Sequence, residues 1–388
     1  MAVINRIAAF HPEMIEWRHD IHAHPETAFE EHRTADVVAQ KLEAFGLPVH
    51  RGLAGTGVVA TLKVGTSDRQ IGLRADLDAL HVEELNGFDW RSQHKGKMHA
   101  CGHDGHTTML LGAAKYLAET RNFDGTVHFI FQPAEENEGG GRVMVEEGLF
   151  DLFPADRVFG MHNMPGMPVG SFGIRPGPLM ASFDIFEATV TGKGGHAAMP
   201  QGCIDPVVCG AAIVTAWQTI ASRMTAPLDA AVVSVTQFHA GDAWNVIPNS
   251  AVLRGTTRSF RLEVQNSLEP AMRRIAEGIA AAHGCSVELR YERRYPPTIN
   301  SAAETEMAIA AARDVAGAQA VDTDVTPRMG SEDFSFMLQA KPGAYIFIGN
   351  GDASNGANLH NPHYDFNDDI LPLGASYFAR LTEQLLAR

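Results

Sequence analysis

Histidine and cysteine are concentrated in one short stretch of the chain. Residues 99–106 read His-Ala-Cys-Gly-His-Asp-Gly-His, directly before an apolar segment of helical period. Because Cys101 and His103 are two residues apart, an extended segment would point both side chains the same way, where they could bind one ion or a bridged pair. A single histidine in a glycine-rich loop is more often a surface residue, but a cluster this dense favours a metal site.

Two adjacent acids, Glu135 and Glu136, follow the apolar run at residues 126–131. In an open parallel sheet, ligands bind beyond the carboxyl ends of the strands, which is where these acids would lie. Neighbouring carboxylates point in different directions, so one could bind a metal while the other faces a bound water. Taken alone, the pair is equally typical of an exposed acidic turn.

Two further histidines each follow a strand-like run. His162 comes after the apolar run 157–161, and His360 follows the run 344–348 and a loop rich in Gly and Asn. Each alone is typical of a polar loop residue. Several loops that carry Cys, His or Glu at one edge of a sheet indicate a shared site instead.

The side chains of metal-ligand type in this set are Cys101, His103, Glu136, His162 and His360. A single catalytic zinc uses three protein ligands and a water, so a set of this size predicts two ions that share a bridging ligand. Such a pair polarises a carbonyl group and lowers the pKa of a bound water toward neutrality. Glu135 would remain free as the general base, and the chemistry predicted is metal-assisted hydrolysis.

One more motif, GKGGHAAMP at residues 192–200, carries His196 outside this cluster. A glycine-rich turn could lift the imidazole toward another surface, where it could donate to a developing oxyanion. An exposed histidine in a hairpin or loop explains the motif nearly as well.

Hydrophobic periodicity predicts the elements that must position these residues. In the first part of the chain it predicts helices within 17–45 and at 107–120 and strands at 57–64, 70–75, 126–131 and 157–161. Helices near 303–316 and 331–340 and a strand at 344–348 continue this pattern near the end. Alternating strands and helices indicate an α/β fold with a mainly parallel or mixed sheet and helices on both faces.

The middle of the chain has a different pattern, which begins after the Pro/Gly-rich residues 176–180. Its order is strand 183–191, helix 206–222, strands 230–239 and 251–259, helix 263–283 and strand 285–292. This is the ferredoxin-like order βαββαβ. We therefore predict a catalytic domain of residues 1–181 and 294–388, interrupted by a small domain at 182–293.

The composition excludes several classes of protein. Lys and Arg number 31 against 46 Asp and Glu, a formal net charge of −15, so the chain would repel nucleic acids and anionic membranes. Its 4 cysteines include no CxxC pair and indicate a reducing compartment. No secretory signal and no run of about 18 apolar residues is recognisable, which predicts a cytoplasmic protein.

The chain resembles the aminoacylase and carboxypeptidase G type of dinuclear metallopeptidases. It is most similar to the amidohydrolase branch that includes hippurate hydrolase, N-acetyl-diaminopimelate deacetylase and the plant indole-acetyl-amino-acid hydrolases. The motifs that carry this resemblance run nearly end to end: WRHDIH at 17–22, RADLDAL at 74–80, HACGHDGH at 99–106, FQPAEE at 131–136, MHNMP at 161–165, GKGGHAAMP at 192–200, NVIP at 245–248, GTTR at 255–258, MGSEDF at 329–334 and LHNPHYDF at 359–366.

The resemblance implies roles for individual residues. It implies that the five ligands named above bind two divalent ions, with Cys101 where most relatives outside the branch have a bridging Asp, and that Glu135 is the base. The inserted domain would act as a lid and dimerise the chain, so that His196 reaches the active site of the partner subunit. Asn245 and Arg258 resemble residues that hold the amide and the carboxylate of the substrate.

Together these observations predict hydrolysis of the amide of an N-acyl or N-aroyl amino acid, a small-molecule substrate. A dipeptidase or carboxypeptidase, or an N-acetyl-diaminopimelate deacetylase, is the alternative within the family. Two interpretations from other classes are open: a cysteine hydrolase with Cys101 as nucleophile and His103 as base, and a non-catalytic metal-binding or peptide-binding protein. Zinc or manganese, and also cobalt or nickel, would suit the site. We expect a homodimer or higher homo-oligomer and neither a nucleic-acid nor a membrane partner.

Overall fold

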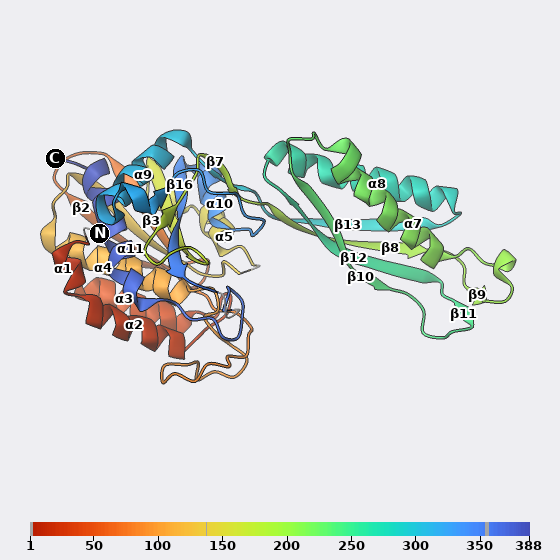
Figure 1. Cartoon of the computed structure of the whole chain (residues 1–388), viewed down its shortest axis with the longest axis horizontal. Coiled ribbons are helices and arrows are strands. Elements are labelled where there is room, and N and C mark those ends of the chain that lie inside the picture. Colours follow the sequence, from red (N-terminus) through yellow and green to blue (C-terminus); the bar gives the residue numbers. More distant parts are fainter. Residues whose placement is uncertain (1–2, 137, 354–356) are drawn as a thin grey trace. The chain divides into compact units, whose positions relative to one another are not determined.

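The computed structural model describes residues 3–136, 138–353 and 357–388. The chain divides into two compact units, whose elements are labelled in Figure 1. The larger unit comprises Met1–Gly177, Ile299–Thr326 and Asp333–Arg388, and the smaller comprises Pro178–Thr298 and Pro327–Glu332. The role of residues 182–293 as a lid domain stays a prediction.

A mixed sheet of eight strands forms the centre of the larger unit. Its order is β1-β2-β4-β3-β5-β16-β6-β15, and the neighbours β4, β3, β5 and β16 are parallel. The predicted α/β class with a mixed sheet is confirmed. The strands are β1 (Val49–Leu53), β2 (Gly57–Val64), β3 (Gln70–Asp76), β4 (Gly125–Gln132), β5 (Arg157–Pro165), β6 (Phe172–Gly173), β15 (Val321–Asp322) and β16 (Gly343–Gly351).

Helix α4 (His103–Thr120) is the central helix of this unit. Every residue from His103 to Ala114 is buried, because α4 packs on β3, β4 and β5 while α2, α3 and α11 contact it from other sides. A helix that is buried all round belongs to the core. The other helices are α1 (Asn5–Ala8), α2 (His11–Ala23), α3 (His32–Ala44), α5 (Gly140–Glu146), α6 (Leu149–Leu152), α9 (Ala302–Ala316), α10 (Phe334–Ala340) and α11 (Leu371–Leu385).

The smaller unit is built on a four-stranded antiparallel sheet of order β10-β12-β8-β13. Alternate side chains of β8, such as Phe186, pack with Trp217 of α7 and Met272 of α8 in one apolar core. The chain order is the expected βαββαβ. The elements are β8 (Phe183–Thr191), β9 (Gly195–His196), α7 (Pro206–Thr219), β10 (Ala231–His239), β11 (Val246–Ile247), β12 (Ser250–Ser259), α8 (Leu262–Ala282) and β13 (Ser286–Tyr295), with β7 (Gly177–Met180) and β14 (Thr298–Asn300) at the boundaries.

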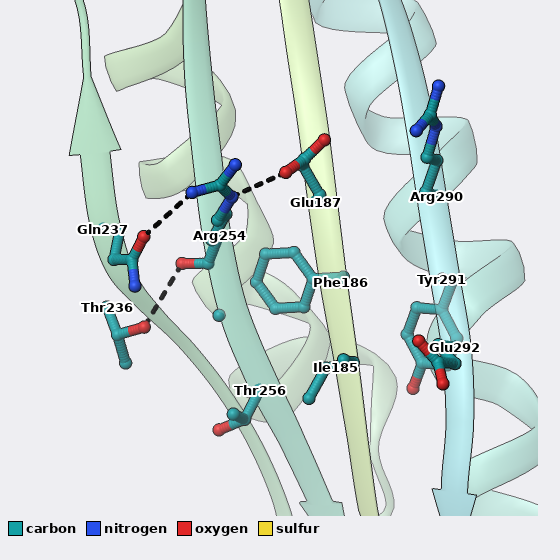
Figure 2. Close-up of a pocket in the computed structure, with 11 residues that line it drawn as sticks. Ile185, Phe186, Glu187, Thr236, Gln237, Arg254, Thr256, Arg290, Tyr291 and Glu292 are labelled. Atoms are coloured by element: carbon teal, nitrogen blue, oxygen red, sulfur yellow. Dashed lines mark hydrogen bonds and ion pairs between the residues drawn. The ribbon is translucent and has the colours of Figure 1, made fainter.

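Residues of all four strands of this sheet also line a hollow of about 510 Å³, with Phe186 among them. Figure 2 shows Gln237, Arg254 and Glu187 side by side on three neighbouring strands, with Arg254 Nε donating to Glu187 Oε2 over 2.6 Å. Because Arg254 is about half exposed, this ion pair contributes little to stability.

One helix of the described residues, Pro206–Met224, is long and apolar enough to cross a membrane by length and composition, with a mean hydropathy of 1.2. It consists of α7 and the π-helical turn Ile220–Met224. A core helix of a water-soluble protein meets the same criterion, so the observation is weak by itself.

Two local predictions about the ligand segments are wrong. Residues 101–103 are not extended, because Gly102 has a left-handed backbone and α4 already begins at His103. His162 does not lie on a loop after a strand, since β5 continues to Pro165 and pairs His162 with Phe347 of β16.

Candidate metal centre

Three of the predicted ligands lie at or just beyond the carboxyl ends of parallel strands that meet at one edge of the large sheet. Glu136 follows β4, His162 lies near the end of β5, and His360 follows β16. The backbone N–H of His360 donates to the carbonyl of Ala100 over 2.7 Å and ties this loop to the segment before α4. The topology explains how residues far apart in the sequence reach one place.

Gly102 shapes the turn between Cys101 and His103. Its φ of +91° lies in the left-handed region, and a Cβ at this position would lie 2.4 Å from Oδ1 of Asn163 and 2.5 Å from the Tyr364 hydroxyl. Any other residue would be strained and would collide with both groups. The turn, rather than an extended segment, brings the thiol and the imidazole together.

Asp78 fixes the ring of His103. Nδ1 of His103 lies 2.9 Å from the backbone oxygen of Asp78 and 3.2 Å from its Oδ1, and because the carbonyl can only accept, Nδ1 carries the proton. The other nitrogen, Nε2, is buried and has no hydrogen-bond partner among the described residues. Oδ2 of Asp78 accepts from the N–H of Glu136 over 2.9 Å. Such a carboxylate is the usual orienting partner of a metal-binding imidazole.

His162 is oriented in the same manner. Its Nδ1 donates to the backbone oxygen of Asn163 over 2.6 Å, so its Nε2 presents a lone pair, 3.4 Å from Sγ of Cys101. On the solvent side, Nε2 of His360 lies 3.1 Å from Oε1 of Glu136, and the His360 side chain is 53% exposed. His162 therefore reaches the cluster from the buried side, and His360 reaches it from the side exposed to solvent.

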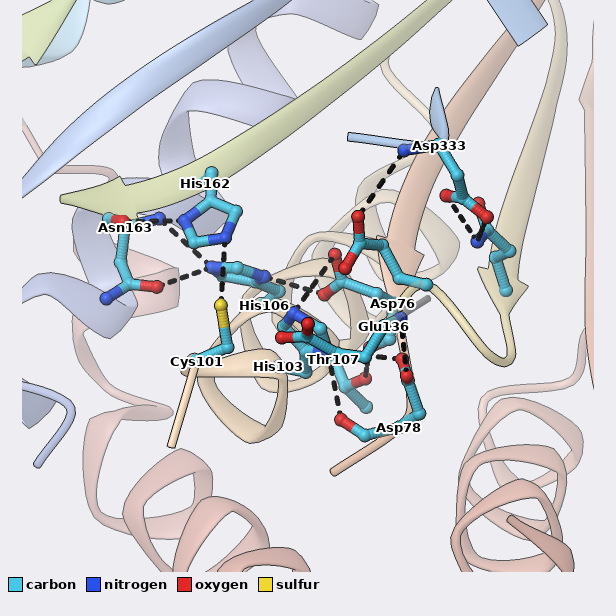
Figure 3. A network of polar contacts seen from close by, with 12 residues as sticks. Asp76, Asp78, Cys101, His103, His106, Thr107, Glu136, His162, Asn163 and Asp333 are labelled. Carbon is cyan, nitrogen blue, oxygen red and sulfur yellow. Dashed lines mark hydrogen bonds and ion pairs between the residues drawn. The ribbon is translucent and has the colours of Figure 1, made fainter. Parts of the chain in front are cut away.

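The described residues form several overlapping groups of metal-ligand type, and three of these triads consist of predicted site residues alone. In each triad the ligand atoms all lie within 4.8 Å of one another. The triads are Cys101, His103 and His162; Cys101, Glu136 and His360; and His103, Glu135 and Glu136. Figure 3 shows how Cys101, His103, Glu136 and His162 converge. Because Cys101, His103 and Glu136 each belong to two triads, the arrangement fits a pair of ions with a shared ligand, and thiol, imidazole and carboxylate donors suit zinc.

Buried charge dominates the electrostatics of the cluster. Burial by itself would lower the pKa of His103, but Asp76 and Asp78 raise it to about 10. Burial, followed by the nearby carboxylate of Glu136, raises the pKa of the Cys101 thiol well above its usual value. A divalent cation would offset the carboxylate charge, and its binding would displace protons from these ligands.

His106, the last residue of the HACGHDGH motif, is already fully engaged. Its Nδ1 lies 2.6 Å from Oδ1 of Asp76, and its Nε2 accepts from the N–H of Asn163 over 3.0 Å. Asp76 also accepts from the buried Arg74 over 2.7 Å. Both ring nitrogens of His106 therefore have partners among the described residues, and its ligand atoms also lie within 4.8 Å of those of Asp76 and His103.

A second buried network fastens α2 to the start of α4. Asp104 accepts from Nδ1 of His22 over 2.9 Å and from Nη1 of Arg18 over 3.2 Å, and all three side chains are fully buried. Burial lowers the pKa of His22, but Asp104 outweighs that effect and raises it to about 9. A buried charge network of this kind holds the residue next to His103 in place.

Glu31, which the sequence analysis did not single out, holds the loop of the acid pair. Its Oε1 accepts from the backbone N–H groups of Phe29 at 3.0 Å and Ala134 at 2.9 Å, and its Oε2 accepts from the Thr56 hydroxyl at 2.7 Å. Phe29 and Ala134 have left-handed φ values of 60° and 55°, which are uncommon for residues with a Cβ. One buried carboxylate oxygen thus fixes the residue before Glu135.

The remaining predicted site residues belong to the smaller unit. His196 lies in β9, which pairs with β11, and the carbonyl of Asn245 accepts from the N–H of Ala197 over 3.0 Å, so His196 and Asn245 are neighbours. Arg258 lies on β12 with its guanidinium 4.2 Å from the centre of the Phe183 ring. Their part in any reaction stays a prediction.

The family model for peptidase family M20/M25/M40 matches residues 72–384. The chain belongs to this family. Hippurate hydrolase of Campylobacter jejuni is 41% identical over 386 residues that cover 100% of both chains. IAA-amino acid hydrolase ILR1-like 2 of Arabidopsis thaliana is 42% identical over 97% of this chain and 86% of the relative. The predicted family resemblance is confirmed.

A solved structure of an M20 family member supports the dinuclear interpretation of the centre. The YXEP protein of Bacillus subtilis, described as a dinuclear metal binding peptidase, matches with a TM-score of 0.84 and 36% identity over 98% of this chain and 99% of that one. Candidate ligand triads and this relationship together support two divalent ions in this M20 chain.

Substitution of Glu31 tests its function in this M20 chain. Glu31→Gln keeps an oxygen that can accept both backbone N–H groups, whereas Glu31→Leu leaves one buried and one partly buried donor without this partner, at a cost of about 2 kcal/mol. We expect hydrogen exchange at the amides of Phe29 and Ala134 to accelerate in Glu31→Leu and to stay slow in Glu31→Gln. Thr56→Val, which removes only the hydroxyl partner, is the control. Equal exchange in the Gln and Leu variants would contradict this role.

Proposed function

We propose that the chain is a metal-dependent amidohydrolase that cleaves the amide of N-acyl or N-aroyl amino acids to a carboxylic acid and a free amino acid. The convergence of five ligand-type side chains, three of them buried, beside the further buried carboxylate of Glu135 carries this proposal. Relatives named hippurate hydrolase and IAA-amino acid hydrolase support the substrate class.

Cys101, His103, Glu136, His162 and His360 would hold the two ions. When bound, the ions would polarise the scissile carbonyl and acidify the attacking water. We infer zinc or manganese, with cobalt and nickel also compatible with the donors.

Glu135 would act as the general base. Its side chain is 6% exposed, and a carboxylate oxygen lies within 4.8 Å of ligand atoms of both His103 and Glu136. From this position Glu135 would take a proton from the attacking water and return it to the nitrogen of the leaving amino acid. A protein that only binds metal would need the ligands but not this additional acid.

We further propose that the chain forms a homodimer through the smaller unit and that His196 acts on the oxyanion in the partner subunit's site. Large apolar side chains exposed on this unit support the dimer: Val207, Val208, Phe238, Trp244 and Val246. Trp244 and Val246 flank Asn245, and β10 is an outer strand of its sheet. Apolar surface of this kind usually marks an interaction site. Asn245 and Arg258 would hold the amide and the carboxylate of the substrate.

Chelation and a single isosteric substitution test the proposed chemistry. Treatment with EDTA should abolish hydrolysis of N-acyl amino acids, and added metal should restore it. Glu135→Gln should keep its metal but lose about 100-fold or more in kcat, because the base is gone. Glu146→Gln, the same change at an exposed position of α5, is the control. Product detection by mass spectrometry from a mixture of acetyl, benzoyl and longer N-acyl amino acids and dipeptides separates the alternatives within the family.

Two outcomes would contradict this proposal. Activity that survives EDTA would favour Cys101 as a metal-independent nucleophile with His103 as its base. No cleavage of any member of the mixture with zinc or manganese present would favour a non-catalytic binding protein.

A charged substitution tests the dimer. Val208 is 55% exposed on α7, and Val208→Asp would place a charge within the proposed apolar contact. We expect the mass in solution, measured by light scattering, to fall from that of a dimer to that of a monomer. Ala310→Asp, on the exposed side of α9, should leave the mass unchanged. A wild-type monomer, or a Val208→Asp dimer, would refute the interface.

A further inference from the structure

The MGSEDF motif at residues 329–334 has no part in the chemistry proposed above, although it carries Asp333. Asp333 lies in the network of Figure 3, and its backbone N–H donates to Oε1 of Glu135 over 3.4 Å. Asp333 is fully buried and Glu135 is 6% exposed, so bulk water has little access to this bond. A residue 198 positions away in the sequence therefore contacts the carboxylate of the proposed base.

The carboxylate of Asp333 is held by donors on both sides of the acid pair. Nε2 of Gln132, at the end of β4, lies 2.7 Å from Oδ1 and 2.8 Å from Oδ2 of Asp333. The backbone N–H of Gly141, in α5, donates to Oδ2 over 2.7 Å. Nη2 of Arg74 donates to Oδ1 over 3.0 Å and supplies the opposite charge that a buried carboxylate needs. Asp333 thus joins the strand before Glu135 to the helix after it.

Gly141 leaves the space that this contact requires. A Cβ at this position would lie 2.9 Å from Oε1 of Gln132, 3.1 Å from Cγ of Asp333 and 3.1 Å from the backbone oxygen of Asp333. Because these distances are shorter than ordinary van der Waals contacts, even alanine would push Asp333 away by a few tenths of an ångström. Gly141 lies in a helix, so steric room rather than backbone conformation makes glycine necessary here.

We propose that Asp333 is a positioning residue, whose backbone N–H fixes the direction in which the Glu135 carboxylate faces. The inference rests on the proposed function, because it takes Glu135 as the general base. A base must lie within hydrogen-bond reach of the proton that it removes, and a displacement of about 1 Å can cost about 100-fold in rate. Loss of the clamp on Asp333 would let the Glu135 side chain turn away from the attacking water without removing a metal ligand.

Two substitutions separate the position of Asp333 from its charge. Asp333→Asn removes the charge and sets its amide N–H groups against other donors in either orientation, whereas Gly141→Ala displaces the carboxylate and keeps its charge. We expect both variants to lower kcat for N-acyl amino acids, Asp333→Asn by about tenfold or more, while KM changes by less than about threefold and the metal content stays that of the wild type.

Matched controls use the same side-chain changes elsewhere. Asp68→Asn alters an exposed residue between β2 and β3, and Gly278→Ala adds a Cβ on α8 that meets nothing within 4 Å. Neither control should change kcat. Should Asp333→Asn fail to fold, Gly141→Ala carries the same test, and an unchanged kcat in Gly141→Ala would overturn the positioning role.

A double-variant cycle tests whether Asp333 acts through Glu135. In the Glu135→Gln background, adding Asp333→Asn should cost less than about threefold in kcat, because the base is already gone. A merely structural role would cost the same factor in both backgrounds. That result would overturn the inference and leave the proposed function standing.

Crystal structures of the metal-loaded wild type and of Asp333→Asn and Gly141→Ala give a readout that does not depend on turnover. We expect the Glu135 carboxylate to rotate or to occupy more than one conformation in the variants, while Cys101 and His103 keep their positions. A Glu135 carboxylate in its wild-type orientation in both variants would contradict the inference. If Glu135 is displaced but the wild-type chain cleaves no amide, the proposed function alone is refuted.

Discussion

The larger unit is constrained by the burial of several carboxylates at one edge of its sheet. Asp76 and Asp333 are fully buried and Asp78 nearly so, and burial of unpaired charge costs several kcal/mol per group. Arg74 offsets part of this cost, since its guanidinium donates to Asp76 over 2.7 Å and to Asp333 over 3.0 Å. The divalent ions that the centre would hold would supply further positive charge.

The same edge contains backbone conformations that an unconstrained chain would avoid. Phe29, Ala134 and His360 all have positive φ, and each is held by a hydrogen bond of its backbone N–H. These bonds run to Glu31 in the first two cases and to Ala100 in the third. A centre held in this way loses little entropy when ions or substrate bind, because its geometry exists beforehand.

Much of this arrangement could be predicted from the sequence, because dense motifs and strand periodicity are local signals. Such signals predict the cluster around Cys101, the acids after β4 and the βαββαβ order of the smaller unit. Asp78 lies three residues after the predicted strand 70–75, yet its partner His103 lies on another segment, so its role requires the folded chain. Glu31 has no local signal at all, since its contacts to Ala134 depend on how two loops meet. The left-handed turn at Gly102 could not be predicted either, because the Asn163 and Tyr364 side chains that leave no room for a Cβ there come from distant parts of the chain.

We infer that Cys101 would serve as a ligand shared by two metal sites at the end of this sheet. Titration of the metal-stripped protein with cobalt, followed by absorption spectroscopy, tests it most directly, because a cobalt–thiolate bond has a charge-transfer band. We expect two equivalents of cobalt to bind per chain, the thiolate band to appear, and Cys101→Ser to abolish it. Binding of a single equivalent, or a titration without a thiolate band, would contradict the account.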